Sequence, residues 1–228
     1  MKYYIANPEL DRQIKEIRAK IRLSMNGIVS DQMTQNGIIY KKNYGVDIPR
    51  IKEISKSYAS NHDLAQRLWN LKIRETMIMA TLLEPIDKFT EEIALEWAES
   101  FNQIEIVEQT GMNLFSKLPY ATSLSLKWIH SDNSWIQISG YIIAARVSSK
   151  FNQNETAEIV QNVLKSANTN DLHLYKAMAL CLSRCCRKGK EAATYILKEI
   201  DAFSQSSSTA QRYIYNEVKQ EIFFLNIL

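Results

Sequence analysis

The sequence predicts an all-α protein built from stacked pairs of helices, and two observations lead to this fold class. The 228 residues include only 6 Gly and 4 Pro, too few breakers for an all-β chain with many turns. Apolar residues recur at helical spacing in segments of about 10–18 residues, which are joined by connections of about 2–6 residues. With 46% hydrophobic residues, the chain can bury one substantial core.

The individual helices follow from caps and apolar stripes. Asn7 and Pro8 open the first helix, a second covers about 28–40, a third begins at Asp47 and a fourth at Asn61. Residues 73–83 are apolar on most sides, which predicts a central helix that ends before Pro85. Further helices are expected at 90–99, 103–117, 121–130, 134–149, 154–166, 171–187, 189–203 and 208–226. This gives about 12–13 helices. No connection is long enough to separate two domains, so a single domain over 1–228 is predicted.

Charge and composition exclude several classes of protein. The chain has no long apolar run and no signal-peptide pattern at its N-terminus, so neither a membrane span nor a membrane partner is expected and the location is predicted to be cytoplasmic. The net charge of +3 is unevenly distributed, because residues 84–108 carry 8 acids and 1 Lys, or −7, which leaves +10 elsewhere. A polyanion could bind those cations only where the fold gathers them on one side.

Three cysteines, Cys181, Cys185 and Cys186, lie within six residues, while the three histidines are scattered. This arrangement does not provide a metal site, and buried thiols in a reducing compartment are expected. Nucleotide-binding loops and hydrolase motifs are also missing from the sequence. We therefore expect neither a metal nor a cofactor.

A series of short motifs carries more information. They are Tyr44-Gly45-Val46-Asp47-Ile48-Pro49-Arg50, Leu68-Trp69, Arg74-Glu75, Ile104-Glu105-Ile106-Val107-Glu108-Gln109 and Trp135. In this order and spacing, the chain resembles the HEAT-like-repeat DNA alkylation repair glycosylases of the alkylpurine glycosylase D type, most strongly over residues 40–190. The resemblance implies an α-solenoid of HEAT-like repeats with a concave groove, and duplex DNA, alkylated or not, as the partner of a monomer.

The resemblance also implies a chemistry. Such proteins excise purines alkylated at N3 or N7, which carry positive charge and leave without a general acid. A carboxylate then stabilises the oxocarbenium-like sugar, and aromatic side chains hold the cation. Position by position, Glu108 stands at the catalytic Asp and Glu105 at an earlier Asp, so the chain, if active, would be a DNA N-glycosylase using Glu108.

The resemblance places four residues around the lesion pocket. Trp135 is kept, Ile104 stands where one indole is expected, and Leu180 stands where a second is expected within Lys176-Ala177-Met178-Ala179-Leu180. An arginine is expected near Gln137 or Ile138, and neither residue is cationic. Loss of both indoles and of this arginine predicts weak or absent excision.

Basic residues provide the expected backbone contacts. Arg184, Arg187, Lys188 and Lys190 lie at a helix end, where the helix dipole alone also favours cations and where Gly189 would be the C′ residue. Lys176 is two turns earlier. The expected DNA-binding set is Lys41, Lys42, Arg50, Lys176, Arg184, Arg187, Lys188 and Lys190, all as contacts that do not read sequence.

Other interpretations of the same residues stay open. Glu105 and Glu108 can belong to a solvated helix face, and each Trp can be a core residue. The functions compared are a DNA-binding family member with weak or lost glycosylase activity, an active glycosylase with an altered pocket, and a HEAT-type scaffold that binds a protein partner. Fold alone does not separate them.

Overall fold

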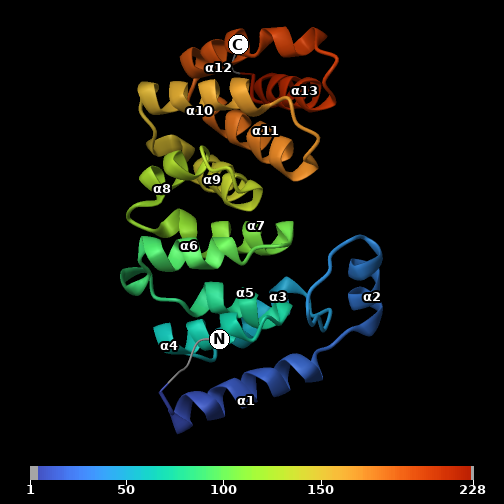
Figure 1. Cartoon of the computed structure of the whole chain (residues 1–228), viewed down its shortest axis with the longest axis vertical. Coiled ribbons are helices and arrows are strands. Elements are labelled where there is room, and N and C mark those ends of the chain that lie inside the picture. The colour runs from blue at the N-terminus through green and yellow to red at the C-terminus, as the bar shows by residue number, and fades with distance from the viewer. Residues whose placement is uncertain (1–4, 227–228) are drawn as a thin grey trace. The chain divides into compact units, whose positions relative to one another are not determined.

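The computed structural model describes residues 5–226, and the regular elements of this part of the chain are helices joined by loops (Figure 1). It contains thirteen α-helices and four short 3-10 helices, and its one β-bridge joins Lys42 to Ile73. The predicted all-α class and the predicted number of helices are confirmed. Contacts divide the chain into two compact units, Met1–Ile93 and Ala94–Leu228. The single domain over 1–228 and its concave groove stay predictions.

The helices of the first unit are α1 (Pro8–Leu23), α2 (Gly27–Gln35), α3 (Ile48–Ser55), α4 (His62–Asn70) and α5 (Arg74–Leu83), followed by a 3-10 turn, η1 (Ile86–Lys88). The boundary between the units falls within α6 (Glu91–Glu99). The second unit continues with α7 (Ile104–Asn113), η2 (Phe115–Lys117), α8 (Ala121–Trp128), α9 (Ser134–Val147), η3 (Ser148–Lys150), α10 (Gln153–Ser166), α11 (Leu172–Cys186), α12 (Lys190–Glu199), η4 (Asp201–Gln205) and α13 (Thr209–Phe224).

Side-chain caps fix most helix starts. An Asn, Asp or Ser side chain accepts a hydrogen bond from the first turn of eight helices, and these caps are Asn7, Asn26, Asp47, Asn61, Asn133, Asn152, Asp171 and Ser208. Each such bond satisfies a backbone N–H that the helix leaves unpaired, which is worth about 1 kcal/mol. The caps explain why most predicted starts agree with the structure to within a residue or two.

Several predicted helix ends were too late, among them that of the segment 189–203, whose α-helix ends at Glu199. Helix α2 ends at Gln35 rather than near 40, because Gly37 takes a φ of 81° and the chain turns back on Met33 and Thr34. The segment 103–117 breaks at Leu114, and the segment 134–149 ends as α-helix at Val147. Gly189 is not the C′ residue of α11 but the N-cap of α12, since α11 ends at Cys186 with Arg187 as its C-cap.

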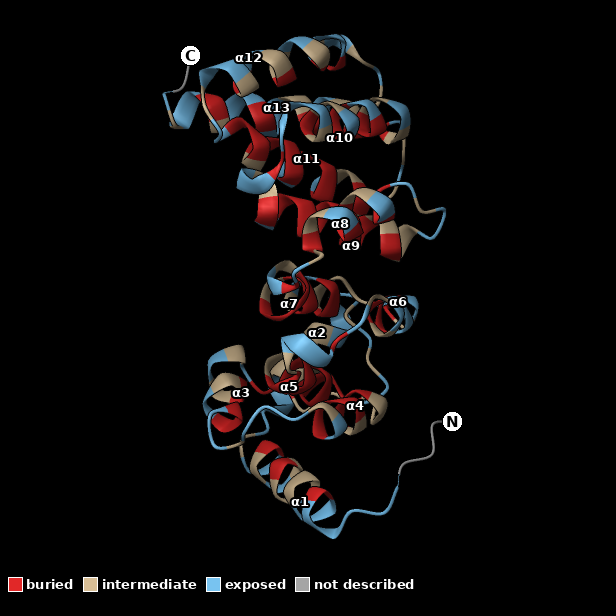
Figure 2. Cartoon of the chain, turned by 90° about the vertical axis from the view of Figure 1, so that its left-hand side faces the viewer, coloured by how far each residue is buried: buried red, intermediate tan, exposed pale blue. Residues whose placement is uncertain are grey.

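The first unit is organised by α4 and α5, which pack on each other, with α3 against α5 and α1 against α3 and α4. Its largest fully buried side chain is Trp69, and α5 is buried along nearly its whole length (Figure 2). Burial of α5 on several faces agrees with the central helix predicted from residues 73–83. By contrast, α2 has no buried residue.

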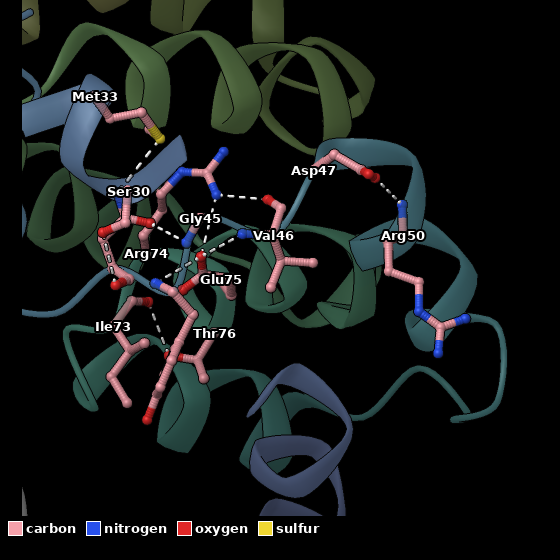
Figure 3. A network of polar contacts seen from close by, with 12 residues as sticks. Ser30, Met33, Gly45, Val46, Asp47, Arg50, Ile73, Arg74, Glu75 and Thr76 are labelled. Carbon is pink, nitrogen blue, oxygen red and sulfur yellow. Dashed lines mark hydrogen bonds and ion pairs between the residues drawn. The ribbon is translucent and has the colours of Figure 1, made fainter. Parts of the chain in front are cut away.

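A buried carboxylate joins α5 to the loop before α3 (Figure 3). Glu75 Oε1 accepts hydrogen bonds from the backbone N–H groups of Tyr44 at 3.0 Å and Val46 at 3.3 Å. It also pairs with Arg74 at 3.2 Å, and Arg74 donates to the Val46 carbonyl at 2.7 Å. The motifs at 44–50 and 74–75 therefore meet in space as one structural network.

The second unit is built around α9 and α11, which pack on each other; α7 and α8 pack on α9, and α13 packs on α11. Trp97 and Trp128 are core residues, as is Trp69 in the first unit, whereas Trp135 is half-buried. All three cysteines are buried free thiols on α11, as expected. The α9–α11 pair forms the support for the candidate functional site.

Candidate functional site

Helix α7 presents Ile104 and Glu108 on one face, because they lie four residues apart, about one helical turn. The next residue along this face is Gly111. A Cβ there would lie 2.8 Å from the Ile142 Cγ2 of α9 and 3.9 Å from Arg146 Nε. Only a glycine allows α7 to approach α9 this closely. The approach brings the Glu108 side chain toward Ile142 and Arg146.

Asp171 aligns the N-termini of α9 and α11. Its Oδ1 caps α11 by accepting from His173 N at 2.9 Å and Leu174 N at 3.1 Å, and its Oδ2 accepts from the Ser134 hydroxyl at 2.5 Å. With the two helix starts joined, Trp135 stacks on His173, with ring centroids 5.9 Å apart and an angle of 29° between the planes. Trp135, the indole that the resemblance keeps, therefore packs against His173.

These three helices enclose a pocket of about 330 Å³. It is lined by Ile104, Glu108, Ile142, Leu172, His173, Lys176, Ala177 and Leu180. Four residues that the sequence singled out, Ile104, Glu108, Lys176 and Leu180, meet here. Ile104, Ile142 and Leu180 form aliphatic walls, so the aromatic wall of the pocket is His173 with Trp135 behind it.

Three other predicted site residues, Ile138, Glu105 and Trp135, do not line this pocket. Ile138 is 1% exposed and belongs to the core, and Ile142, one turn later on α9, takes the position at the pocket. Glu105 is half-buried and acts on Glu108 only through its charge. Trp135 contributes through His173.

Glu108 is the acid of the pocket, and its environment disfavours its ionised form. Desolvation by the surrounding side chains raises the pKa of the Glu108 carboxyl, although Arg146 and His173 partly offset this through their positive charge, while Glu105 adds to the rise. Within residues 5–226 its carboxylate accepts no hydrogen bond. The carboxylate is available to a ligand, but the neighbouring groups do not strongly stabilise its charge.

A second hollow, of about 560 Å³, adjoins the pocket, since Leu180 lines both. It is lined by Arg146, Arg184, Arg187, Lys188, Ser116, Ser148, Ser149, Ala145 and Leu180. We refer to it as the cationic hollow. It gathers four cations and three hydroxyl groups from α9, α11 and the turns next to them, which is suitable chemistry for phosphate oxygens.

The four cations are not equally available. Arg184 NH1 lies 3.6 Å from Glu221 Oε1 of α13, and Arg187 forms an ion pair with the same oxygen. Lys188 Nζ donates to the Phe151 carbonyl at 2.5 Å and to Thr156 Oγ1 at 3.3 Å, which fastens the end of α11 to the start of α10. Arg146 is exposed and donates no hydrogen bond to any residue between 5 and 226. Partial burial lowers the pKa of Arg146, the charge of Glu108 opposes this, and the charge of Arg184 adds to the lowering.

The remaining predicted cations lie elsewhere. Lys190 lines a separate hollow between the starts of α10 and α12, and Lys188 borders it too. Lys41, Lys42 and Arg50 lie in the first unit, where Lys42 stacks on the Tyr44 ring and Arg50 pairs with Glu53 at 2.7 Å. The structure thus brings Lys176, Arg184, Arg187 and Lys188 to one side of α11.

Sequence reasoning missed Arg146 and His173. For His173 a signal existed, because it lies three residues before Lys176 and seven before Leu180, on the same face of α11. Arg146 lies eight residues after Ile138, two helical turns beyond the place where an arginine was expected. Its position depends on the close approach of α7 to α9 at Gly111, which the sequence does not display.

Residues 5–226 contain no cluster of three or more His, Cys, Asp or Glu that could hold a metal ion. Among the described helices, none combines the length and the apolar character needed to cross a membrane.

Comparison with solved structures supports this architecture. One protein aligns over 90% of this chain and 94% of its own length, with a TM-score of 0.76 at 14% sequence identity. It is described as belonging to a new family of proteins related to the HEAT-like repeat DNA glycosylases, with affinity for branched DNA structures. An engineered protein aligns over 77% of this chain and 84% of its own length, at 13% identity and a TM-score of 0.42.

The first alignment establishes the fold as an all-α array of HEAT-like repeats. No curated protein matches the sequence significantly. The model of one protein family, the DNA alkylation repair enzymes, matches residues 5–213, which is most of the chain. The chain therefore belongs to the DNA alkylation repair enzyme family.

Proposed function

We propose that this protein binds duplex DNA through its sugar–phosphate backbone, with N-alkylpurine excision weak or lost. The observation that carries the proposal is the cationic hollow, in which Arg146, Arg184 and Arg187 surround a cavity edged by serine hydroxyls. Guanidinium groups bind phosphate oxygens in pairs, and hydroxyl groups add neutral donors. Lys176, at the rim of the adjoining pocket, extends the positive charge along α11.

The other predicted cations take supporting places in this proposal. Lys190 borders the neighbouring hollow at the start of α12, where it can hold a further phosphate, whereas Lys188, whose Nζ donates to Phe151 and Thr156, contributes its positive charge to both hollows. Lys41, Lys42 and Arg50 provide backbone contacts from the first unit. Binding of this kind does not read sequence, and its affinity falls steeply with salt because each contact releases condensed counterions.

Weak or lost excision follows from the charges around Glu108. A carboxylate stabilises an oxocarbenium-like sugar through its negative charge, and desolvation, which raises the pKa of Glu108, makes that charge less favourable. Lys176 lines the same pocket, and Arg146 is close enough to influence Glu108, so two cations would repel a positively charged purine. Aliphatic Ile104 and Leu180 give no cation–π attraction, worth about 0.5–2 kcal/mol for each aromatic ring.

The structural neighbour widens the range of DNA substrates to test. That protein is described by its affinity for branched DNA structures, and this chain shares its fold. Cations that contact the sugar–phosphate backbone can bind a duplex arm in linear DNA and in branched DNA alike. We therefore include junctions among the ligands for the binding experiment.

The binding test measures duplex affinity by fluorescence anisotropy over a series of salt concentrations. Arg146→Ala is expected to weaken binding to all sequences alike and to lower the slope of log K against log salt by about 1. Lys165→Ala, which removes an exposed cation of α10 outside the hollow, is the matched control. A native protein that binds no DNA, or an Arg146→Ala variant identical to native, would contradict the proposal.

The excision test is single-turnover release of 7-methylguanine and 3-methyladenine from methylated duplex DNA. We expect salt-sensitive binding with little or no release. An active glycosylase is the second candidate, and the observation in its favour is that Glu108 lines the same pocket as Ile104, Lys176 and Leu180. Release that Glu108→Gln abolishes, without loss of DNA binding, would establish that candidate instead.

If the protein neither binds DNA nor releases a base, both DNA readings fail. The scaffold interpretation would then apply, with a protein partner to be sought.

A further inference from the structure

The first unit carries an uncovered apolar surface at the turn between α1 and α2. Leu23 is 88% exposed, Met25 66% and Ile28 72%. We name these three residues the apolar ridge. Helix α2 itself has no buried residue, so its position is not explained by burial of an apolar face. Three large apolar side chains so exposed within six residues indicate a surface that meets a partner.

The ridge rests on a rigid support rather than on a loose loop. The backbone N–H of Asn26 donates to the Tyr44 carbonyl at 2.8 Å, and the Ser30 hydroxyl donates to the Asn43 carbonyl at 3.1 Å. At Gly45 the two segments touch, because a Cβ there would lie 2.1 Å from the Asn26 carbonyl oxygen. The same loop is held from beneath by the buried Glu75 carboxylate (Figure 3).

Positive charge surrounds the ridge. Lys20 and Arg22 occupy the last turn of α1, and Arg50 Nε donates to the Ser24 hydroxyl at 3.0 Å, within the turn that carries the ridge. Lys41 and Lys42 immediately precede the loop that supports α2.

Acids are scarce in this segment. Between residues 20 and 50 the chain has five cations and two acids, Asp31 and Asp47. Asp47 caps α3 by accepting from Arg50 N at 2.7 Å, and Glu53, just beyond this segment, pairs with the Arg50 guanidinium at 2.7 Å. Even with Glu53 included, the five cations outnumber the three acids.

We propose that the apolar ridge inserts against unstacked bases at branch points or unpaired positions in DNA, while the surrounding cations hold the adjacent phosphates. Aliphatic side chains such as Leu, Ile and Met act as wedges between base steps, and insertion costs least where bases are already unstacked. The surface combines both features that such a site needs, an apolar tip for base faces and cations for the backbone.

An anionic lipid surface is the competing partner, since it also attracts apolar side chains next to cations. The composition of α2 argues against it. Ser30, Asp31, Gln32, Thr34 and Gln35 interrupt the helix with polar groups, whereas a helix lying in a membrane interface needs a continuous apolar face. A tip of three side chains fits a gap between bases better.

The inference rests on the proposed DNA binding and adds a preference for a DNA structure. The experiment compares one linear duplex with a four-way junction whose arms have the same sequence, using the full-length chain. The test variant is Leu23→Ser/Met25→Ser/Ile28→Ser. The control is Phe223→Ser/Phe224→Ser, which removes two other highly exposed apolar side chains at the end of α13.

We expect the ridge variant to lose junction affinity by about tenfold while its duplex affinity changes by less than about twofold, and the control to change neither. A 2-aminopurine at the branch point should change its fluorescence with native protein and respond less with the ridge variant. Equal affinities of native and ridge variant for the junction would overturn the inference alone. A native protein that binds neither DNA would overturn the proposed function with it.

Vesicles containing anionic lipid test the competing partner. If the ridge binds DNA and not lipid, the ridge substitutions should leave vesicle binding unchanged. If vesicle binding depends on the ridge while junction affinity is unchanged in the ridge variant, the partner of the ridge is a membrane surface and not DNA. Because the substituted side chains are solvent-exposed, thermal unfolding of the ridge variant should match that of native protein, which excludes misfolding as the cause of a loss.

Discussion

Glu75 Oε1 accepts a hydrogen bond from the backbone N–H of Tyr44 at 3.0 Å, across 31 residues of sequence. The carboxylate is fully buried, and its other oxygen, Oε2, is buried without a hydrogen-bond partner. One oxygen therefore holds the loop before α3, while Arg74, itself 5% exposed at its side chain, supplies the compensating charge. This pair supports the segment on which α2 rests.

Glu75→Ala should destabilise the protein by about 3–5 kcal/mol, because it removes the carboxylate that pairs with the buried Arg74 cation and accepts from two backbone N–H groups. Urea unfolding measures the change. Glu53→Ala is the control, since it also breaks a Glu–Arg pair, but one exposed to solvent, and should cost at most about 1 kcal/mol. Equal effects of the two substitutions would show that the buried pair has no special role in stability.

The sequence could predict the parts of this structure that depend on local patterns. Caps such as Asn7 and Asn61 marked helix starts, and the motif from Lys176 to Leu180 supplied two residues that line the same pocket. It could not predict that Glu75 binds the loop at Tyr44, because that contact depends on how distant helices pack. The same limit applies to Arg146, whose place in the cationic hollow depends on the approach of α7 to α9.

Gly45→Ala should separate α2 from its support. Gly45 has a φ of 68°, and an added Cβ would meet the backbone of Asn26 and Ser30 at 2.1 and 2.8 Å. Hydrogen exchange of the amides of residues 26–35 should accelerate, and junction affinity should fall if the ridge is held by α2.

Two controls separate the causes of that effect. Gly37→Ala introduces a Cβ at a φ of 81° into open space, so it tests backbone strain alone, which costs about 1–2 kcal/mol. Gly27→Ala, in α2 itself, introduces a Cβ with nothing within 4 Å and so tests the added methyl group without a close contact. If Gly37→Ala accelerates exchange in α2 as much as Gly45→Ala, the contact with Asn26 does not determine the position of α2.

Glu108→Gln should change how stability depends on pH. The folded protein raises the pKa of this acid above the ordinary value of 4.5, so its ionised form is less favourable in the folded than in the unfolded state. The resulting loss of stability is complete above the folded pKa and disappears as the pH falls through that pKa to below 4.5. Glu108→Gln removes the ionised form.

The melting temperature of Glu108→Gln should therefore exceed that of native protein near neutral pH, and the two should converge in acid. Asp132→Asn, at an exposed acid between α8 and α9, serves as the control for loss of one negative charge. A Glu108→Gln variant that is less stable than native at neutral pH would mean that its charge is stabilised in the pocket, in favour of an active carboxylate.

Glu221→Gln should strengthen DNA binding. Glu221 Oε1 of α13 holds both Arg184 and Arg187, so this acid competes with phosphate for two cations of the cationic hollow. Without its charge, both guanidinium groups can turn to the DNA, and we expect duplex affinity to rise about 2- to 10-fold at low salt. Because salt screens the added attraction, the gain should shrink as ionic strength rises.

Glu217→Gln is the control, because it removes the same charge one turn earlier on α13, where Glu217 pairs with neither arginine. A smaller gain for this control would show that the effect of Glu221→Gln comes from the release of Arg184 and Arg187. If both variants gain affinity equally, net charge rather than the geometry of the hollow controls binding, and Arg184 and Arg187 do not act as specific phosphate contacts.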